Sequence, residues 1–256
     1  MYLPSFSLKN KLAVVTGAGR GIGRALSIGL AEAGCDVVLL SRTRRDLEET
    51  AGVIEELGRK AYILPTDVTS REDIQNVISY IEENGMCIDI LINNAGMNIR
   101  STALEVTDEE WQKIMDTNLK SAFMMSQDVG KHMKERNRGK IINIASVAGH
   151  VALRTGVVYA STKAAMIQMT KVLAMEWGKY NIHVNSIGPW YFKTPLTEEL
   201  LQNEEYVSDI LSVTPLKRIG ELEELVGPAV FLSSDASNYV TGQTLFVDGG
   251  MTIHGF

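Results

Sequence analysis

Cysteine and histidine are scarce in this chain, which has two cysteines and four histidines among 256 residues. Cys35 and Cys87 do not form a CxxC pair, and no histidine-rich stretch lies near either of them. Structural zinc sites need such clusters, so we expect no metal centre. The scarcity of cysteine also favours a reducing intracellular compartment over an oxidising one.

Long apolar runs and concentrated positive charge are absent as well. No run reaches the roughly 18 apolar residues that a membrane-spanning helix needs. The first residues, MYLPSFSLKNK, have no apolar core of the kind found in signal peptides. We therefore expect a cytoplasmic protein without a membrane partner. A net charge of −6 and the lack of a long basic stripe exclude a general nucleic-acid binder.

Short aliphatic blocks alternate along the chain with longer segments of helical period. The predicted strands are 12–17, 36–41, 61–68, 88–96, 139–146, 182–189 and 243–250, and the predicted helices are 21–34, 46–58, 71–85, 108–135, 159–178 and 221–234. Strands of nearly continuous aliphatics, each followed by a helix, indicate an α/β fold with a doubly wound parallel sheet. Without linkers or repeats, residues 1–256 are predicted to form a single domain. Residues 191–220 fall outside this rhythm and are predicted to cover the ligand.

A glycine-rich turn joins the first predicted strand to the first predicted helix. Gly17 would make the turn, Gly21 would allow a phosphate to approach, and Gly23 would let the helix pack on the strand. The free N–H groups and the dipole of the helix N-terminus favour a pyrophosphate there. The alternative is a tight turn without a ligand, but the flanking strand and helix favour nucleotide binding.

Three motifs occur in a characteristic order along the chain: TGxxxGxG at 16–23, NNAG at 93–96 and YASTK at 159–163, the last preceded by Ser146. This set resembles the classical short-chain dehydrogenase/reductase family, over nearly all of the chain from Lys11 to Gly250. The resemblance implies a single-domain Rossmann fold with a seven-stranded parallel sheet, assembled as a homotetramer.

Tyr159 and Lys163 suit an acid-base step in hydride-transfer chemistry. They are four residues apart, so they share one helix face, and a lysine ammonium would lower the pKa of the phenol. Such pairs are more often solvated, and it is the glycine turn that favours catalysis. Ser146, at a strand end, could hold the substrate oxygen or merely cap a turn. Asn118 is the fourth catalytic residue by the resemblance alone, where it supports a water that links the lysine to solvent.

The end of the second strand predicts which nicotinamide cofactor binds. An acidic residue there would take the ribose 2′-hydroxyl of NAD, whereas Ser41 is neutral and is followed by Arg42. A guanidinium can bind a 2′-phosphate, and Arg20 lies in the glycine turn nearby. We therefore expect NADP(H), with Arg44 and Arg45 largely solvated. The other cofactor contacts implied by the resemblance are Ile22, Asp67, Val68, Asn94, Ala95, Gly96, Pro189 and Thr194, together with Tyr159 and Lys163.

The substrate is expected to lie beside Ser146 and Tyr159, and the candidate side chains around it are Asn98, Arg100, His150, Arg154, Trp190 and Tyr191. Trp190 stands where the family usually has glycine, and Phe192 replaces an aliphatic residue. The stretches GMNIR, KVLAMEWGKYNIHVN and YVTGQTLFVDGG resemble the gluconate 5-dehydrogenase group. A sugar acid would need a cation for its carboxylate, which Arg100 or Arg154 could supply.

Three alternatives to a sugar-acid dehydrogenase stay open. A 3-oxoacyl-carrier-protein reductase or another carbonyl reductase would use the same catalytic residues, although no clear basic cluster marks a carrier-docking surface. A nucleotide-sensing regulator would keep the fold without turnover, and it is disfavoured because the catalytic set is complete. A purely structural oligomer leaves the glycine turn unexplained.

Overall fold

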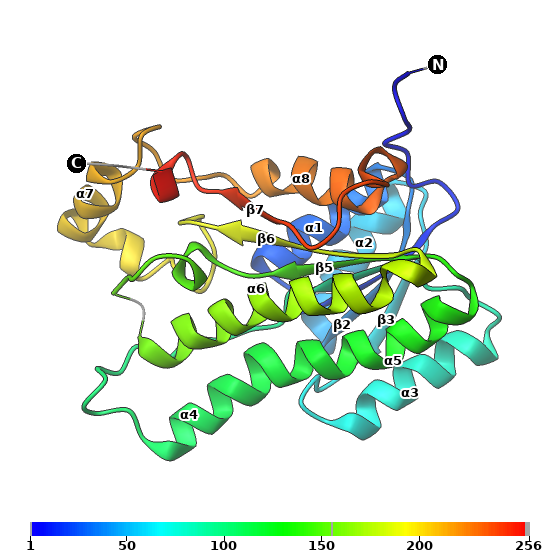
Figure 1. Cartoon of the computed structure of the whole chain (residues 1–256), viewed down its shortest axis with the longest axis horizontal. Helices are drawn as coiled ribbons and strands as arrows, with labels where there is room; N and C mark the ends of the chain where they lie inside the picture. The colour runs from blue at the N-terminus through cyan, green and yellow to red at the C-terminus, as the bar shows by residue number, and fades with distance from the viewer. Residues whose placement is uncertain (1, 155, 254–256) are drawn as a thin grey trace.

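All seven strands lie in one parallel sheet. The computed structural model describes residues 2–154 and 156–253. The strands are β1 (Leu12–Thr16), β2 (Asp36–Ser41), β3 (Ala61–Pro65), β4 (Ile90–Asn93), β5 (Gly139–Ile144), β6 (Ile182–Pro189) and β7 (Thr244–Val247). Their order is β3-β2-β1-β4-β5-β6-β7, so the winding reverses between β1 and β4 (Figure 1). The predicted doubly wound fold is confirmed, and ligands of such sheets bind at this reversal.

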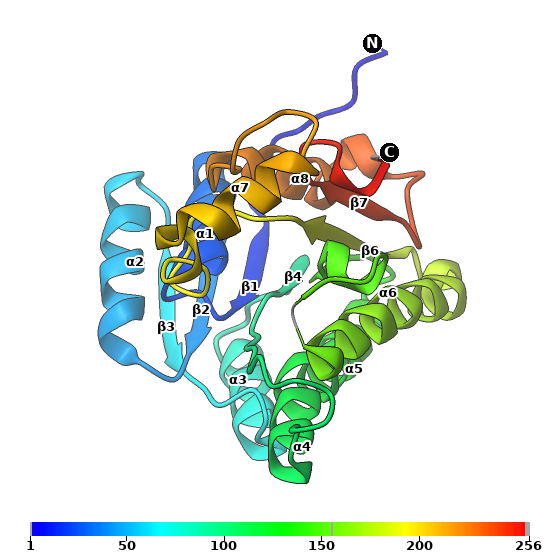
Figure 2. The ribbon, with the colours of Figure 1, turned by 90° about the vertical axis from the view of Figure 1, so that its left-hand side faces the viewer.

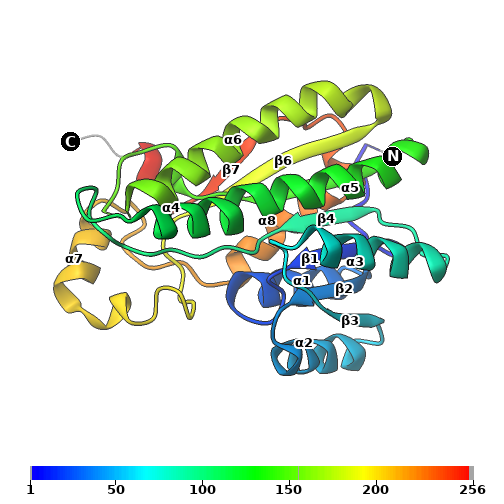
Figure 3. The ribbon, with the colours of Figure 1, turned by 90° about the horizontal axis from the view of Figure 1, so that it is seen from below.

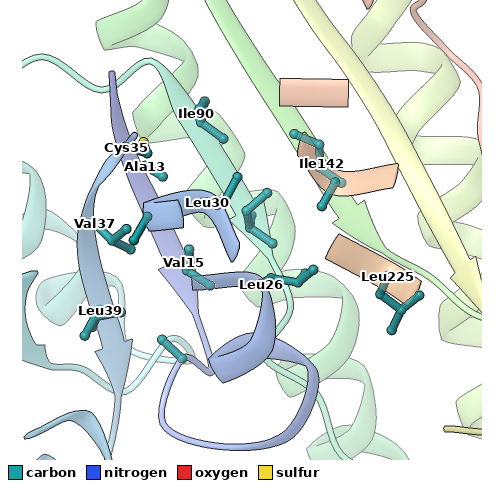
Figure 4. Packing of buried hydrophobic residues seen from close by; sticks show 14 of the residues in the cluster. Ala13, Val15, Leu26, Leu30, Cys35, Val37, Leu39, Ile90, Ile142 and Leu225 are labelled. Carbon is teal, nitrogen blue, oxygen red and sulfur yellow. The ribbon is translucent and has the colours of Figure 1, made fainter. Parts of the chain in front are cut away.

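Helices cover both faces of the sheet (Figure 1). One face carries α1 (Gly21–Glu32), α2 (Arg44–Glu56) and α8 (Glu223–Ser233), and the other carries α3 (Arg71–Glu83), α5 (Ser121–Glu135) and α6 (Val157–Trp177). Alternate strand residues pack in the two layers. Val15 and Leu39 pack with α1, α2 and α8, and Figure 4 shows them with Leu26 and Leu30 of α1 and Leu225 of α8. Val14 and Leu40 pack with α3 and α5. Because both faces are buried, each strand is apolar throughout. None of the helices in the described ranges is long and apolar enough to cross a membrane.

The predicted helix 108–135 has an irregular middle. It consists of α4 (Asp108–Met115), a π-helical turn over Asp116–Lys120 and α5, which lie in line in Figure 3. Asn118 is in the π-helical turn and is fully buried. A π-helical turn widens the helix locally, and such turns are frequent at functional sites.

The segment 191–220 is closed at its base and contains a helix that periodicity did not reveal. The backbone N–H of Gly220 donates to the carbonyl of Tyr191 at 3.0 Å, which ties the two ends together. Between them lies α7 (Glu204–Ser212), capped by Asn203. Figure 2 looks onto the carboxyl edge of the sheet, with α4 and α6 on one side of the view, and Figure 1 shows that α7 lies beyond the carboxyl ends of the strands. Short 3₁₀ turns occupy Val147–Gly149, Gly178–Tyr180, Leu200–Gln202, Asp235–Ser237 and Met251–Ile253.

Candidate active site

A cavity of about 840 Å³ opens at the carboxyl edge of the sheet. Most predicted site residues line it: Gly17, Arg20, Gly21, Ile22, Ser41, Arg42, Asp67, Val68, Asn94, Ala95, Gly96, Asn98, Arg100, Ser146, Tyr159, Lys163, Pro189, Trp190, Tyr191 and Thr194. Gly23, Asn118, His150 and Arg154 were also predicted for the site, but they do not line the cavity. The described residues hold no group of three or more His, Cys, Asp or Glu side chains that could bind a metal ion.

The glycine turn has the geometry that a phosphate cradle needs. Gly17 and Gly21 have φ angles of +67° and +56°, which disfavour residues with a side chain. A Cβ on Gly23 would lie 2.1 Å from the carbonyl oxygen of Gly17, so α1 can pack on the turn only without a side chain there. Gly23 therefore shapes the turn from behind, whereas Gly17 and Gly21 face the cavity.

The N-terminus of α1 is also left free for an anion. Arg20 provides no side-chain cap, and the first turn of α1 has no acidic residue. By contrast, the side chains of Ser70, Thr107 and Asn203 cap α3, α4 and α7, and each of these helices has acidic residues in its first turn. The described residues thus leave the N–H groups and positive dipole of α1 directed at the cavity, which fits the pyrophosphate of a dinucleotide.

Thr16 fixes the turn to the end of β4, a role that the sequence analysis did not identify. Its hydroxyl oxygen accepts hydrogen bonds from the backbone N–H groups of Asn94 (2.9 Å) and Ala95 (3.0 Å). The side-chain amide of Asn94 donates in return to the carbonyls of Thr16 (3.0 Å) and Gly17 (3.2 Å). The threonine that directly precedes the first glycine was the available signal. Asn94 therefore lines the cavity and also joins the end of β4 to the glycine turn.

Lys163 and Tyr159 meet at the end of β5. The Lys163 side chain is 4% exposed, and its ammonium donates to the carbonyl of Ile144 at 2.7 Å. The same nitrogen lies 5.6 Å from the centre of the Tyr159 ring. The Ser146 side chain lies close enough to the Tyr159 hydroxyl to act against the rise of its pKa. The structure therefore brings together the predicted serine, tyrosine and lysine at one end of the cavity.

The ionisation of this group differs from the sequence-based expectation. Burial raises the pKa of Tyr159, and the hydrogen bond from Ser146 only partly opposes this rise. Burial also lowers the pKa of Lys163 to about 8. Both shifts have one cause, since removal from water disfavours the charged form of either side chain. The protein alone therefore holds a neutral phenol beside a lysine that titrates near neutral pH.

Asn118 acts from behind the cavity wall. Its side-chain oxygen accepts from the N–H of Met97 (2.8 Å), and its amide donates to the carbonyl of Met97 (2.8 Å) and to the hydroxyl of Thr162 (3.3 Å). These bonds link the cavity-lining loop after β4 to α6, one residue before Lys163. The side chain is fully engaged in positioning, and the predicted water path through Asn118 stays a prediction.

Gly149 is a further positioning residue that the sequence analysis missed. It lies in the 3₁₀ turn after Ser146, and a Cβ on it would lie 2.6 Å from the backbone carbon of Lys163. Backbone atoms cannot move aside as a flexible side chain can. The absence of a side chain at Gly149 therefore allows α6 to carry Lys163 close to the end of β5.

The arginines after β2 fall into two groups. Arg44 and Arg45 form ion pairs with Glu48 (3.6 Å) and Glu49 (3.4 Å) one turn along α2. Arg42 lines the cavity and has no ion-pair partner within 4.0 Å among residues 2–154 and 156–253. Hydrogen bonds from Thr69, helped by the charge of Arg42, lower the pKa of the Asp67 carboxyl.

Arg20 resembles Arg42, since it lines the cavity and pairs with no carboxylate in the described part of the chain. Asp46, which the sequence analysis did not single out, lines the same region from the first turn of α2. A Cβ on Gly19 would lie 2.7 Å from the Cβ of Asp46 and 3.2 Å from the hydroxyl of Ser41. The glycine turn, the end of β2 and the start of α2 are therefore packed together at this end of the cavity.

The candidate substrate residues are divided between the cavity and its outer rim. The charge of Arg100 counteracts the raised pKa of both Tyr159 and Tyr191, so its guanidinium lies near the two phenols. Arg154 instead forms an exposed ion pair with Asp209 of α7 at 2.6 Å. The exposed ring of His150 packs on Phe246 with centroids 5.0 Å apart. Arg100, together with Asn98, is the candidate that faces the site.

The aromatic residues after β6 have definite orientations. The indole N–H of Trp190 donates to the hydroxyl of Thr214 at 3.0 Å, and its ring meets the edge of Tyr191 with centroids 4.5 Å apart. Phe192 is 4% exposed and packs against Gly220, where a Cβ would lie 2.4 Å from its ring. Trp190 and Tyr191 therefore form the wall of the cavity, while Phe192 mainly anchors the base of the 191–220 segment.

Comparison with known proteins gives consistent matches over the full fold. A family model described as Enoyl-(Acyl carrier protein) reductase matches residues 17–252. Gluconate 5-dehydrogenase of Gluconobacter oxydans (strain 621H) is 43% identical over 249 residues, 97% of either chain. A tropinone reductase homolog of Arabidopsis thaliana is 42% identical, covering 98% of this chain and 96% of the relative. A gluconate 5-dehydrogenase from Burkholderia cenocepacia J2315, crystallised with NADP and tartrate, superposes with a TM-score of 0.95 at 38% identity, covering 99% of both chains.

The parallel sheet, the glycine turn and the Ser146, Tyr159 and Lys163 group together define an oxidoreductase of the α/β class. The chain belongs to the short-chain dehydrogenase/reductase family. The resemblance predicted from its motifs is confirmed, including the likeness to gluconate 5-dehydrogenases.

Lys163→Met should flatten the dependence of stability on pH in the cofactor-free protein. Lys163 has a pKa near 8 when folded and near 10.5 when unfolded, so the unfolded state binds more protons between these values. The free energy of unfolding must then rise with pH across this window. Below pH 8 the folded protein bears the full cost of burying the charged ammonium of Lys163, and above pH 10.5 this cost vanishes. The variant should lower the slope by roughly 1 kcal/mol per pH unit in urea titrations between pH 8 and 9.5.

Lys171→Met provides the matched control, since Lys171 is exposed on the same helix and should leave the slope unchanged. Lys140, whose pKa burial also lowers to about 8, contributes its own slope to all three proteins. Equal slopes for the wild type and Lys163→Met would show that Lys163 keeps an ordinary pKa in the folded state.

Proposed function

We propose that this chain is an NADP(H)-dependent oxidoreductase that interconverts a secondary alcohol and a ketone on a sugar acid, of the gluconate and 5-ketogluconate type. The observation that carries the proposal is the arrangement of the cavity. The acid-base group of Ser146, Tyr159 and Lys163 lies at the end where Arg100 also faces the cavity. The free N-terminus of α1 and the unpaired Arg42 line the same cavity.

The chain's own residues move the proton in this reaction, while the bound nicotinamide would supply or accept the hydride. Ser146 and Tyr159 together can hold the carbonyl oxygen by hydrogen bonds, because both side chains lie at this end of the cavity and Ser146 is near the phenol. Tyr159, neutral in the protein, donates its proton when a ketone is reduced and takes it back when an alcohol is oxidised. Lys163, one turn away and buried, stabilises the phenolate formed during reduction.

Charge at the adenosine end supports NADP(H) over NAD(H). Position 41, where an acidic residue would bind the ribose of NAD, is a neutral serine. Arg20 and Arg42 line the cavity and form no ion pairs with carboxylates in the described ranges. The carboxylates of Asp46 and Asp67 also line this end of the cavity, but neither forms an ion pair with Arg20 or Arg42 within 4.0 Å in the described ranges. Two cations beside a 2′-phosphate give the charge-assisted hydrogen bonds that distinguish the two cofactors. A relative of 38% identity was crystallised with NADP, which agrees with this assignment.

Arg42→Ala should weaken NADPH binding about 10- to 100-fold and change NADH binding less than about 3-fold, because a phosphate contact is lost. Dissociation constants come from the quenching of protein fluorescence on titration with each cofactor. Arg44→Ala is the matched control, since Arg44 is already paired with Glu48. If both cofactors lost affinity equally in Arg42→Ala, the assignment of the 2′-phosphate to this end would be wrong.

Arg100 supports an acidic substrate. It is the cation whose charge reaches both Tyr159 and Tyr191, whereas Arg154 is engaged by Asp209. A carboxylate bound by Arg100 would place the remaining hydroxyl and carbonyl carbons of a sugar acid along the wall towards Tyr159. The crystallised relative that carries tartrate, a hydroxy acid, fits this class of substrate.

A substrate panel with NADPH and NADH tests the proposal: 5-ketogluconate, gluconate, polyols, neutral ketones and an acetoacetyl thioester. We expect NADPH-linked reduction of 5-ketogluconate to be the best reaction. Arg100→Met should raise the KM for 5-ketogluconate about 10-fold or more and leave neutral ketones unaffected, since only the acid loses a charged partner.

Tyr159→Phe is the control for the catalytic step. This variant should lose turnover but still bind NADPH. Good activity with the acetoacetyl thioester and none with sugar acids would favour the carrier-protein reductase alternative. A protein that binds NADPH and acts on no carbonyl compound in the panel would instead favour a nucleotide-sensing regulator.

We also propose that the chain forms a homotetramer in the cytoplasm. Apolar side chains point outward from the layer of α4, α5 and α6, namely Trp111, Phe123, Val172 and Met175. A second set, Tyr239, Leu245 and Ile253, lies around β7 at one edge of the sheet. Two separate apolar surfaces suit the two kinds of interface in a tetramer with dihedral symmetry. Cys35 and Cys87 are free thiols, which agrees with a reducing compartment.

Phe123→Asp and Met175→Asp should each reduce the mass in solution from four chains to two or one, because a charge buried in an interface is costly. Light scattering coupled to size-exclusion chromatography measures this mass. Leu104→Asp, at a fully exposed apolar residue outside both surfaces, is the control. A monomeric wild type, or variants that stay tetrameric, would refute this assembly.

A further inference from the structure

The hydroxyl of Tyr206, on α7, meets the hydroxyl of Tyr191 from the cavity wall at 2.5 Å. Their rings are perpendicular, with centroids 5.9 Å apart. Tyr191 is only 7% exposed and lines the cavity. Burial, together with the hydrogen bond to Tyr206, raises the pKa of Tyr191, so the Tyr191 hydroxyl stays neutral. Tyr206 is thus the polar partner of a buried wall residue.

A second set of contacts returns from the wall to the same helix. Tyr191 packs against Trp190, whose indole N–H donates to Thr214. The hydroxyl of Thr214 donates in turn to the carbonyl of Ile210 on α7 at 2.6 Å. The backbone N–H of Trp190 is held by Val247 of β7 at 3.2 Å. The wall is therefore connected to α7 at two points and to the sheet at one.

Arg154, in the loop before α6, also contacts α7. Its guanidinium pairs with Asp209 and lies 5.5 Å from the centre of the Tyr206 ring. The side chains of Arg154 and Asp209 are 72% and 51% exposed, and exposed ion pairs contribute little to stability. The buried hydroxyl of Tyr191 would lose its partner if Tyr206 moved away, and an unsatisfied buried hydroxyl is far more costly. The tyrosine pair therefore dominates this contact, and Arg154 assists it.

We propose that Tyr206 is a positioning residue for substrate binding: it holds Tyr191 in place as the wall of the substrate end and so fixes α7 over the cavity. Arg154 stabilises Tyr206 and does not bind the substrate. The inference rests on the proposed function in one respect, because it assumes that the carbonyl substrate binds between Tyr159 and Tyr191. Cofactor binding, at the other end of the cavity, is independent of the pair.

Tyr206→Phe removes one hydroxyl and keeps the ring, so it tests the pair without emptying the site. The KM for the carbonyl substrate should rise about 5- to 10-fold, as expected for one lost hydrogen bond, with kcat changed less than about 2-fold and the Kd for NADPH unchanged. Tyr191→Phe should give a similar rise, and the double variant should be no worse than either single one. Tyr2→Phe, at a fully exposed tyrosine outside both proposed interfaces, is the matched control.

A readout without substrate separates this inference from the proposed function. Backbone amides of α7 should exchange with deuterium about 5-fold faster in Tyr206→Phe than in the wild type, whether or not a sugar acid reacts. Arg154→Met should raise KM about equally, and less than about 3-fold, for acidic and neutral carbonyl substrates. If the panel yields no substrate, the proposed function fails. The exchange rates of α7 then decide by themselves whether Tyr206 holds Tyr191 and α7 in place.

Unchanged exchange and unchanged KM in Tyr206→Phe would overturn the inference. A parallel loss of kcat, NADPH affinity and melting temperature would also overturn it, because that pattern marks a general structural role. A large rise in KM for Arg154→Met with acidic substrates alone would show that Arg154 binds the carboxylate.

Discussion

The buried hydrogen bond from the ammonium of Lys163 to the carbonyl of Ile144 is the constraint around which the catalytic end is built. A lysine can reach the end of β5 only if α6 lies very close to it, and the missing side chain of Gly149 permits that approach. Asn118, in its π-helical turn, then joins Thr162 of α6 to the loop after β4. The cost of burying the ammonium appears as its lowered pKa.

At the end of the cavity beside β2, the proposed preference for NADP(H) rests on which charges are left without partners. Helix α2 neutralises Arg44 and Arg45 with its own glutamates one turn on, whereas Arg42 lies before the helix begins and has no such neighbour. The same contrast separates the uncapped α1 from the capped α3, α4 and α7. The free N–H groups of α1 and the cations of Arg20 and Arg42 line one cavity, and this convergence of positive charge favours an anionic ligand there.

The segment after β6 shows how a local departure from a family pattern is accommodated. A tryptophan in place of glycine at position 190 would block the cavity if its indole pointed inward. Its N–H instead donates to Thr214, and its ring packs on Tyr191. The indole therefore forms part of the cavity wall and supports α7 through Thr214. The aromatic residues of this chain thus shape the substrate end, while the glycine turn and the acid-base group keep the arrangement expected from the motifs.

The sequence by itself predicted the doubly wound fold and the glycine turn, because these follow from periodicity and short-range spacing, and the ordered motifs, through their family resemblance, pointed to Ser146, Tyr159 and Lys163. It could not determine the roles of Thr16, Asp46 and Gly149, or that Arg154 turns to Asp209 while Arg100 faces the cavity. Helix α7 was not predicted, although Asn203 is a typical N-cap and Glu204 and Glu205 lie in the first turn, because a helix of 9 residues is too short to stand out from a loop by its period alone. Which charges are paired, and which phenol is buried, depends on contacts between residues far apart in the chain. Only the tertiary structure decides these, since burial sets both the pKa values and the cost of leaving a polar group unpaired.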